Sequence, residues 1–287
     1  MSWLTDAITG WFRETLIDGI IFNFTHMFTE ANREINEVAA QVGQTPAGWN
    51  AGIFSLIQAL SETVIIPIAG VILTFILCYE LIHMIIERNN MHDFETFLLF
   101  KWVFKSFCAV YILTNTFNIV LFVFALAQNV VDGSAGIITG SLDMDMALAD
   151  LAEQLEAMGL IELVAVYFQS ALLTLAMNVL SLVVFLIIYG RMIEIYLVIS
   201  VAPIPMATMV NREWGNIGSG YLKSLFALAF QGFLIMLCLA IYAVLLQGIA
   251  SAENVHIAMW GAAGYTALLA FMLFKTGSLA KSLFSAS

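Results

Sequence analysis

The fold is decided by residues 161–209, IELVAVYFQSALLTLAMNVLSLVVFLIIYGRMIEIYLVISVAPIPMATM. The charged residues of this stretch are Glu162, Arg191 and Glu194. A helix needs only about 20 apolar residues to cross a bilayer, so this run is too long for one simple span. The run breaks at VAPIP, because a proline inside a helix removes a backbone hydrogen bond and clashes with the preceding turn. We therefore expect a membrane protein whose long helix breaks at Pro203 and Pro205.

The composition excludes an ordinary soluble domain. Hydrophobic residues make up 61% of the 287 residues and charged residues 11%, and the mean hydropathy is +0.94. Soluble domains usually contain about 25% charged residues. We therefore predict an all-α, polytopic membrane protein. The three cysteines, Cys78, Cys108 and Cys238, fall inside expected spans at spacings that fit no disulfide or zinc framework, and we interpret them as small apolar side chains.

The N-terminal residues 2–28 have the pattern of an amphipathic helix. Their apolar positions recur at helical spacing and include Trp3, Leu4, Ala7, Ile8, Trp11, Phe12 and Leu16. We expect this helix to lie in the membrane interface; the alternative is packing on the protein's own core. A polar, acidic connector follows and ends at the turn signal TPAGWN. Residues 1–50 are accordingly predicted as an extracytoplasmic region that precedes a transmembrane domain at 51–287.

Five transmembrane helices are expected in that domain. They are placed at Ser61–Ile86, Leu98–Leu126, Ile161–Tyr189, Tyr221–Leu246 and Ile257–Phe274. The segment 191–209 allows three interpretations: an extension of the third helix, a re-entrant segment or a sixth span.

The distribution of basic residues favours five spans. With the N-terminus outside and the C-terminus in the cytoplasm, all basic residues except Arg13 and Arg33 lie on the inner side, as the positive-inside rule requires. The outer loop at 128–160 then carries six acidic residues, with Glu162 directly after it as a seventh, and no basic residue. It is expected to contain a short helix at Asp143–Met158. A sixth span at 191–209 would move Arg212 and Lys223 outside.

Polar side chains inside the spans are the candidate pore or interface residues. One set on the second span comprises Lys101, Lys105, Asn115 and Asn118, and one on the third span comprises Ser170, Thr174, Asn178 and Ser181. Such residues either line a conduit, form a subunit interface or hold helices together; the two lysines can also extend to the cytoplasmic interface. Arg191 and Glu194 are interpreted either as an i,i+3 ion pair or as a charged ring at the mouth of an oligomeric pore.

No catalytic motif is recognisable. Gly215 and Gly220 have the spacing of a phosphate-binding loop, but Tyr221 and Leu222 occupy the positions that require Lys and Ser or Thr. We therefore expect neither an enzyme nor a cofactor or metal site, and energy for any transport has to come from a partner.

The run VISVAPIPMATMVNREWGNIGSGYLKSLFALAFQGFLIM resembles the core of the TrbL family, the polytopic inner-membrane channel subunits of type IV secretion and conjugation machines. The matching positions are Ala202, Pro203, Trp214, Gly220 and Lys223. The resemblance is strongest over residues 160–280.

The resemblance implies a non-enzymatic channel or scaffold subunit in the bacterial cytoplasmic membrane. Its expected partners are further copies of the chain, lipids, secretion ATPases, a coupling protein and, transiently, a DNA–protein substrate. The alternative is a stand-alone transporter or small-solute channel. Two observations argue against it: the sequence shows no internal repeat, and spans 2 to 5 have no carboxylate near their middle.

Overall fold

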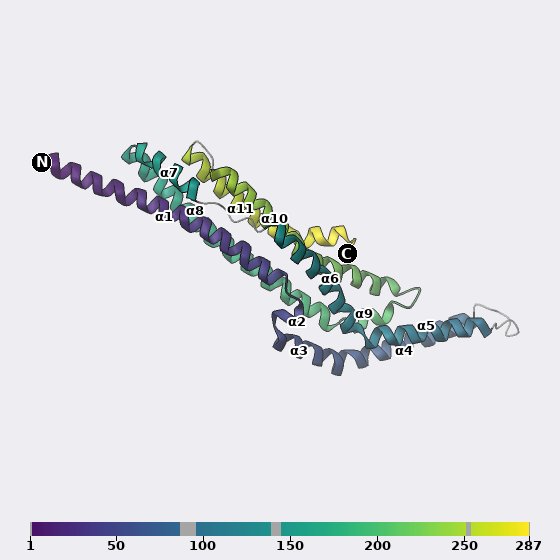
Figure 1. The fold of residues 1–287 in the computed structure, drawn as a ribbon. Helices are drawn as coiled ribbons and strands as arrows, with labels where there is room; N and C mark the ends of the chain where they lie inside the picture. The colour runs from purple at the N-terminus through teal and green to yellow at the C-terminus, as the bar shows by residue number, and fades with distance from the viewer. Residues whose placement is uncertain (1, 87–95, 139–144, 251–253, 287) are drawn as a thin grey trace. The chain divides into compact units, whose positions relative to one another are not determined.

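The structure is a computed structural model that describes residues 2–86, 96–138, 145–250 and 254–286 (Figure 1). Over these residues it contains helices and no strand, which confirms the predicted all-α class. The elements are α1 (Ser2–Val42), α2 (Pro46–Trp49), α3 (Ala51–Leu60), the π-helical turn η1 (Ser61–Ile65), α4 (Ile66–Ile86), α5 (Thr96–Thr114), α6 (Thr116–Ile138), α7 (Asp145–Ala157), α8 (Leu160–Ser200), α9 (Pro203–Thr208), α10 (Gly215–Ala250) and α11 (Val255–Leu283).

Six helical stretches of the described residues are long and apolar enough to cross a membrane. They are Ala51–Ile86, Phe97–Thr114, Thr116–Gly133, Leu160–Ser200, Gly215–Gly248 and Val255–Leu283. The number differs from the five expected because the span predicted at Leu98–Leu126 is divided into α5 and α6 at Asn115.

Local hydrogen bonds explain this division. Three successive polar side chains bond back to the preceding turn: Thr114 Oγ1 donates to the Val110 carbonyl at 2.9 Å, Asn115 Nδ2 to the Tyr111 carbonyl at 2.9 Å and Thr116 Oγ1 to the Leu113 carbonyl at 2.8 Å. Side chains that bond to main-chain carbonyls in this way compete with regular helical pairing and bend helices.

The segment 191–209, left open by the sequence, is a helix extension followed by a short helix. The helix α8 continues to Ser200, so it contains 41 residues and is about 60 Å long at 1.5 Å per residue. This length is about twice the thickness of a bilayer's hydrocarbon core. The following helix α9 has six residues and is too short to span.

The chain divides into two compact units. Unit 1 comprises Met1–Val42, Val131–Ile188 and Phe233–Thr276, and unit 2 comprises Gly43–Val130, Tyr189–Gly232 and Gly277–Ser287. Because α6, α8, α10 and α11 are each divided between the units, each of these helices supplies residues to both units.

In unit 1, α1 is longer than the predicted helix at 2–28, and one face of it is buried from Leu16 onward. The buried positions recur every three or four residues: Leu16, Ile20, Phe24, Met27, Ala31, Ile35, Val38 and Val42. They share a core with residues of α7, α8, α10 and α11. The segment Leu16–Val42 therefore packs on the protein's own core. Trp3 and Trp11 are exposed, so an interfacial location stays a prediction for the first turns of α1.

The short helix expected at Asp143–Met158 is α7, and residues 139–144 of the predicted outer loop lie outside the described residues. Leu151 and Leu155 bury it in the core of unit 1. Arg13 of α1 holds its C-terminal end, since Nη2 donates to the carbonyls of Glu156 and, at 2.8 Å, Met158.

Unit 2 has two apolar clusters. The larger joins α6, the end of α8 and α10 through side chains that include Val123, Ile199 and Leu228. The smaller joins α4, α5 and α9 through Ala69, Leu73, Ala109, Leu113 and Ala207. Its alanines allow these helices to approach closely, as small residues do in membrane helix packing.

Candidate functional site

The corner between α8 and α10 is built from the segment that carries the family resemblance. Pro203 occupies the start of α9, where its missing N–H costs no helical hydrogen bond. Asn211 turns the chain into α10: its Oδ1 accepts hydrogen bonds from the backbone N–H groups of Glu213 at 2.7 Å and Trp214 at 3.0 Å. The sequence thus ends one helix and starts the next within a few residues.

A glycine allows α9 and α10 to come together at this corner. A Cβ atom on Gly218 would lie 2.6 Å from the Pro205 carbonyl oxygen and in contact with Met209 Cγ. Real Cβ atoms essentially never approach other heavy atoms this closely. Gly220, two residues later, has no such neighbour within 4 Å.

Aromatic stacking attaches this corner to α4. The Trp214 ring stacks on the rings of Phe75 and Tyr79, with centroid separations of 6.0 Å and 5.9 Å. Aromatic pairs in such offset arrangements add to the stability that burial alone provides. The loop before α10 is therefore held against the middle of α4.

The helices α4 and α5 are joined by polar contacts. The Lys105 ammonium forms an ion pair with the Glu80 carboxylate, and the Trp102 indole N–H donates to the Leu77 carbonyl at 3.3 Å. Both contacts connect positions 25 residues apart in the chain. They fix α5 beside α4 with its basic residues on the side of the loop at 211–213.

A cavity of about 620 Å³ lies among these three segments of unit 2. Three cations, Lys101, Lys105 and Arg212, and two carboxylates, Glu80 and Glu213, are in its wall. The cavity therefore brings together the two basic residues that the sequence places on the second span, and it adds a third from the loop after α9. No pattern in the sequence indicated that Glu80 is the partner of Lys105.

Arg191 and Glu194 do not form the ion pair that their spacing allows. Arg191 is buried and donates through Nε to the Leu228 carbonyl at 3.3 Å and through Nη2 to the Ala229 carbonyl at 3.4 Å, while its Nη1 has no hydrogen-bond partner among the described residues. Glu194 pairs instead with Lys281, at 3.3 Å. The ion-pair interpretation is wrong because the two side chains leave α8 toward different helices.

The other polar residues of the second span lie at the junction of α5 and α6. Asn118 Nδ2 donates to Asn115 Oδ1 at 3.3 Å, and Asn118 is exposed. Their hydrogen bonds are local, within about one turn, whereas Lys101 and Lys105 lie at the cavity. The four residues therefore do not form one continuous lining within a single chain.

The polar set on α8 lies in unit 1. Ser170 is buried and accepts a hydrogen bond from Asn23 Nδ2 of α1 at 2.8 Å, and Ser181 is hydrogen-bonded to Glu34 of the same helix. Thr174 is partly buried and bonds to the Ser170 carbonyl at 3.1 Å, and Asn178 is exposed. Two members of the set thus connect helices within the chain, and Asn178 presents its amide at the surface.

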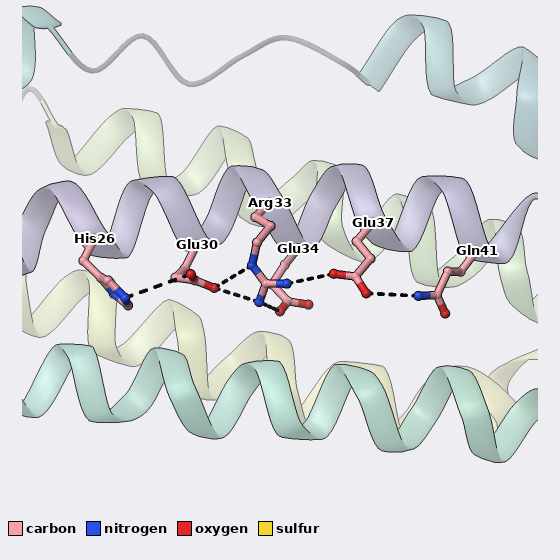
Figure 2. Close-up of polar contacts among 6 residues, drawn as sticks. All are labelled: His26, Glu30, Arg33, Glu34, Glu37 and Gln41. Carbon is pink, nitrogen blue, oxygen red and sulfur yellow. Dashed lines mark hydrogen bonds and ion pairs between the residues drawn. The ribbon is translucent and has the colours of Figure 1, made fainter.

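Sequence reasoning missed a polar ladder along α1 that Figure 2 shows, consisting of His26, Glu30, Arg33, Glu34, Glu37 and Gln41. The Arg33 guanidinium bonds to three carboxylates, with distances of 2.9 Å to Glu30, 2.8 Å to Glu37 and 2.8 Å to Glu34. Its hydrogen bond with Glu30 and the surrounding carboxylates raise the pKa of Arg33. The i,i+3 and i,i+4 spacing of these charges is the signal that could have predicted the ladder.

Glu34 is the buried member of this ladder. Burial raises the pKa of its carboxyl, against the opposing effects of the hydrogen bond with Ser181 and the charge of Arg33. A second buried polar contact in unit 1 links α10 to α11, where the hydroxyls of Tyr242 and Thr266 are 2.9 Å apart. These contacts specify helix pairing, and within the described residues no group of three His, Cys, Asp or Glu side chains is arranged to hold a metal ion.

Comparison with known proteins identifies a family. A family described as TrbL/VirB6 plasmid conjugal transfer-like proteins matches residues 31–203, from α1 to the start of α9. Of the residues that carry the resemblance, Ala202 and Pro203 lie inside the matched region, and Trp214, Gly220 and Lys223 follow it. Neither the curated proteins nor the solved structures gave a match. With more than half of its residues matched and its helices long and apolar, the chain belongs to the TrbL/VirB6 family of conjugal transfer proteins.

Proposed function

We propose that the chain is a non-enzymatic channel or scaffold subunit of a conjugative type IV secretion system in the bacterial cytoplasmic membrane. It helps a DNA–protein substrate to cross that membrane together with secretion ATPases and a coupling protein. The observation that carries the proposal is the family match over residues 31–203, which includes the apolar helices α4, α5, α6 and α8.

The length of the helices supports a scaffold role. The stretch Ala51–Ile86 has 36 residues and α8 has 41, so each is longer than the roughly 20 residues that a simple span requires. The excess is sufficient for these helices to extend beyond the hydrocarbon core, where they can present side chains to other subunits.

The cavity in unit 2 supports the proposed orientation. Lys101, Lys105 and Arg212 come from α5 and from the loop before α10, and they line one cavity. They must therefore lie on the same side of the membrane, which the positive-inside rule makes the cytoplasmic side. We accordingly propose five crossings, with α5 and α6 together forming one, the N-terminus outside and the C-terminus in the cytoplasm.

Association of several copies is part of the proposal. Helices α4 and α5 expose large apolar side chains that include Val71, Phe75, Phe100 and Phe107, each at least 60% exposed. Either lipid or neighbouring copies of the chain can cover such apolar surfaces. In a homo-oligomer, the exposed side chains of Asn118 and Asn178 are polar groups of the predicted sets that can face a conduit or a second subunit.

The test is a mating assay with the native conjugative element. Deletion of the gene is expected to abolish transfer, and expression of the wild-type chain in trans to restore it. Formaldehyde cross-linking followed by immunoprecipitation of the chain then tests whether transferred-strand DNA contacts it during mating. Transfer at the wild-type frequency after deletion would reject the proposal and favour the stand-alone transporter.

Two further measurements test the topology and assembly. A cysteine introduced at Asn216, in the first turn of α10, is expected to react with a membrane-impermeant maleimide only after the membrane is opened. Labelling of intact cells would reject the cytoplasmic location of this end of α10. Native mass spectrometry of the chain extracted with its lipids is expected to show an oligomer, and a monomer under all lipid conditions would contradict association.

A further inference from the structure

We propose that the cavity between α4, α5 and the loop at 211–213 is a binding site for the phosphate-bearing headgroup of an anionic phospholipid. The cavity and its lining residues belong to unit 2 alone. The inference is independent of the secretion role, because it rests on the charge and geometry of this cavity.

The cavity contains cationic groups that have no partner among the described residues. Lys105 is neutralised by Glu80, but Lys101 and Arg212 form no hydrogen bond or ion pair with any residue of the described chain. Both are exposed. Phosphate oxygens suit both of them, because Arg offers a planar fork of donors and Lys a compact charge.

The size of the cavity fits a headgroup. Ligand sites in proteins typically have volumes of about 300–1,000 Å³, and this cavity measures about 620 Å³. Its three cations face two carboxylates, Glu80 and Glu213, so the lining carries a net positive charge in a chain whose formal net charge is −11. A net negative ligand is therefore favoured at this place over a neutral one.

The surroundings favour a lipid as the source of the phosphate. Phe97 and Phe104 lie four residues before and three residues after Lys101, on the same side of α5, and they are 69% and 60% exposed. The acyl chains of a bound lipid can pack against this exposed apolar surface of α5. Tyr79 and Trp102 line the cavity itself, and these aromatic residues are typical of the membrane–water interface. Basic pockets between membrane helices on the cytoplasmic side are known to bind anionic headgroups.

The experiment is a titration of the full, delipidated chain in detergent, followed by native mass spectrometry. The probes are dioctanoyl phosphatidylglycerol, dioctanoyl phosphatidylcholine as the zwitterionic control, and inorganic phosphate. The variant is Lys101→Gln with Arg212→Gln. The matched control is Lys223→Gln, which removes an exposed basic residue of unit 2 that is not in the cavity wall.

A basic residue near an anionic lipid surface contributes on the order of fivefold in affinity. We therefore expect the double variant to bind phosphatidylglycerol about thirtyfold more weakly than the wild type, and Lys223→Gln to bind it as the wild type does. The charge-conserving variant Lys101→Arg with Arg212→Lys is expected to retain binding. Phosphatidylcholine should bind more weakly than phosphatidylglycerol.

The outcomes separate the two sources of phosphate. Binding of phosphatidylglycerol that is lost in the double variant alone supports the lipid site. Binding of inorganic phosphate without phosphatidylglycerol would overturn the lipid assignment and leave an anion site that is filled from solution. Equal affinity of the wild type and the double variant, or an equal loss in Lys223→Gln, would overturn the site itself. Circular dichroism and gel filtration of each variant exclude a folding defect as the cause.

Discussion

The close approach of α9 to α10 leads to a prediction about two glycines in one helix. Substitution of Gly218 by alanine places a Cβ 2.6 Å from the Pro205 carbonyl oxygen and against Met209 Cγ. The Met209 side chain can move aside, but the carbonyl is part of the backbone of α9. The same substitution at Gly220 introduces a Cβ that has no neighbour within 4 Å. The two variants therefore differ in packing and not in chemistry.

The expected magnitude follows from two opposing terms. Alanine in place of glycine stabilises a helix by about 0.5–1 kcal/mol, and overpacking in a close-packed site costs about 1–3 kcal/mol. Gly220→Ala should therefore be neutral or stabilising by up to about 1 kcal/mol. Gly218→Ala should be less stable than Gly220→Ala by roughly 1–3 kcal/mol, which at about 2–4 °C per kcal/mol corresponds to a separation of roughly 2–12 °C in Tm.

Thermal unfolding of both variants in the same detergent, followed by circular dichroism, measures the difference. A second step adds Met209→Ala to each background. This change should recover part of the loss in Gly218→Ala, because it removes the side-chain contact and leaves the contact with the carbonyl. Equal Tm values for Gly218→Ala and Gly220→Ala would refute the close packing of α9 against α10.

Three further predictions concern buried polar groups. Burial raises the pKa of Glu34, so the folded state binds its proton more tightly than the unfolded state, and stability should fall as pH rises from about 4.5, the ordinary Glu value, through the raised pKa. Glu34→Gln should raise Tm at pH 7 and flatten this part of the Tm–pH curve, whereas the exposed Glu37→Gln serves as control; an unchanged slope in Glu34→Gln would contradict the assignment. Arg191→Met should leave Tm unchanged or raise it, because it removes a buried cation whose Nη1 lacks a partner among the described residues. A large loss of Tm would contradict this and show that the buried charge is compensated. Tyr242→Phe and Thr266→Val should each lower the free energy of unfolding by roughly 0.6–2 kcal/mol. The two effects should be coupled in a double-mutant cycle, because the two hydroxyls share one hydrogen bond; additive effects would refute that bond.

For much of the candidate site, the sequence predicts which residue types are present but not which of them lie together. The charge distribution identified Lys101 and Lys105 as polar residues at one end of the second span, and the proline-rich run identified the corner before α10. Neither pattern predicted that Arg212 and Glu80 lie at the same cavity as the lysines. These partners are separated by more than 20 residues from the lysines, and helical spacing carries information about neighbours only within about one turn.

The sequence by itself determined the helical, membrane-spanning class of the chain and the positions of most of its long helices. The physical reason is that a bilayer requires long apolar runs whose backbone groups are paired within the segment, so composition and length predict such helices directly. The proline-rich segment likewise ends α8 through the local geometry of its residues.

Only the tertiary structure decided which face of each helix is buried and which polar groups meet. It turned Arg191 toward the carbonyls of α10 and Glu194 toward Lys281, and it buried α1 from Leu16 onward. Almost every residue of the membrane-spanning parts of α8, α10 and α11 is apolar, so hydrophobicity varies too little around these helices to indicate their neighbours. The choice depends on shape, as at Gly218, and on the pairing of a few polar groups, which are properties of the packed helices together.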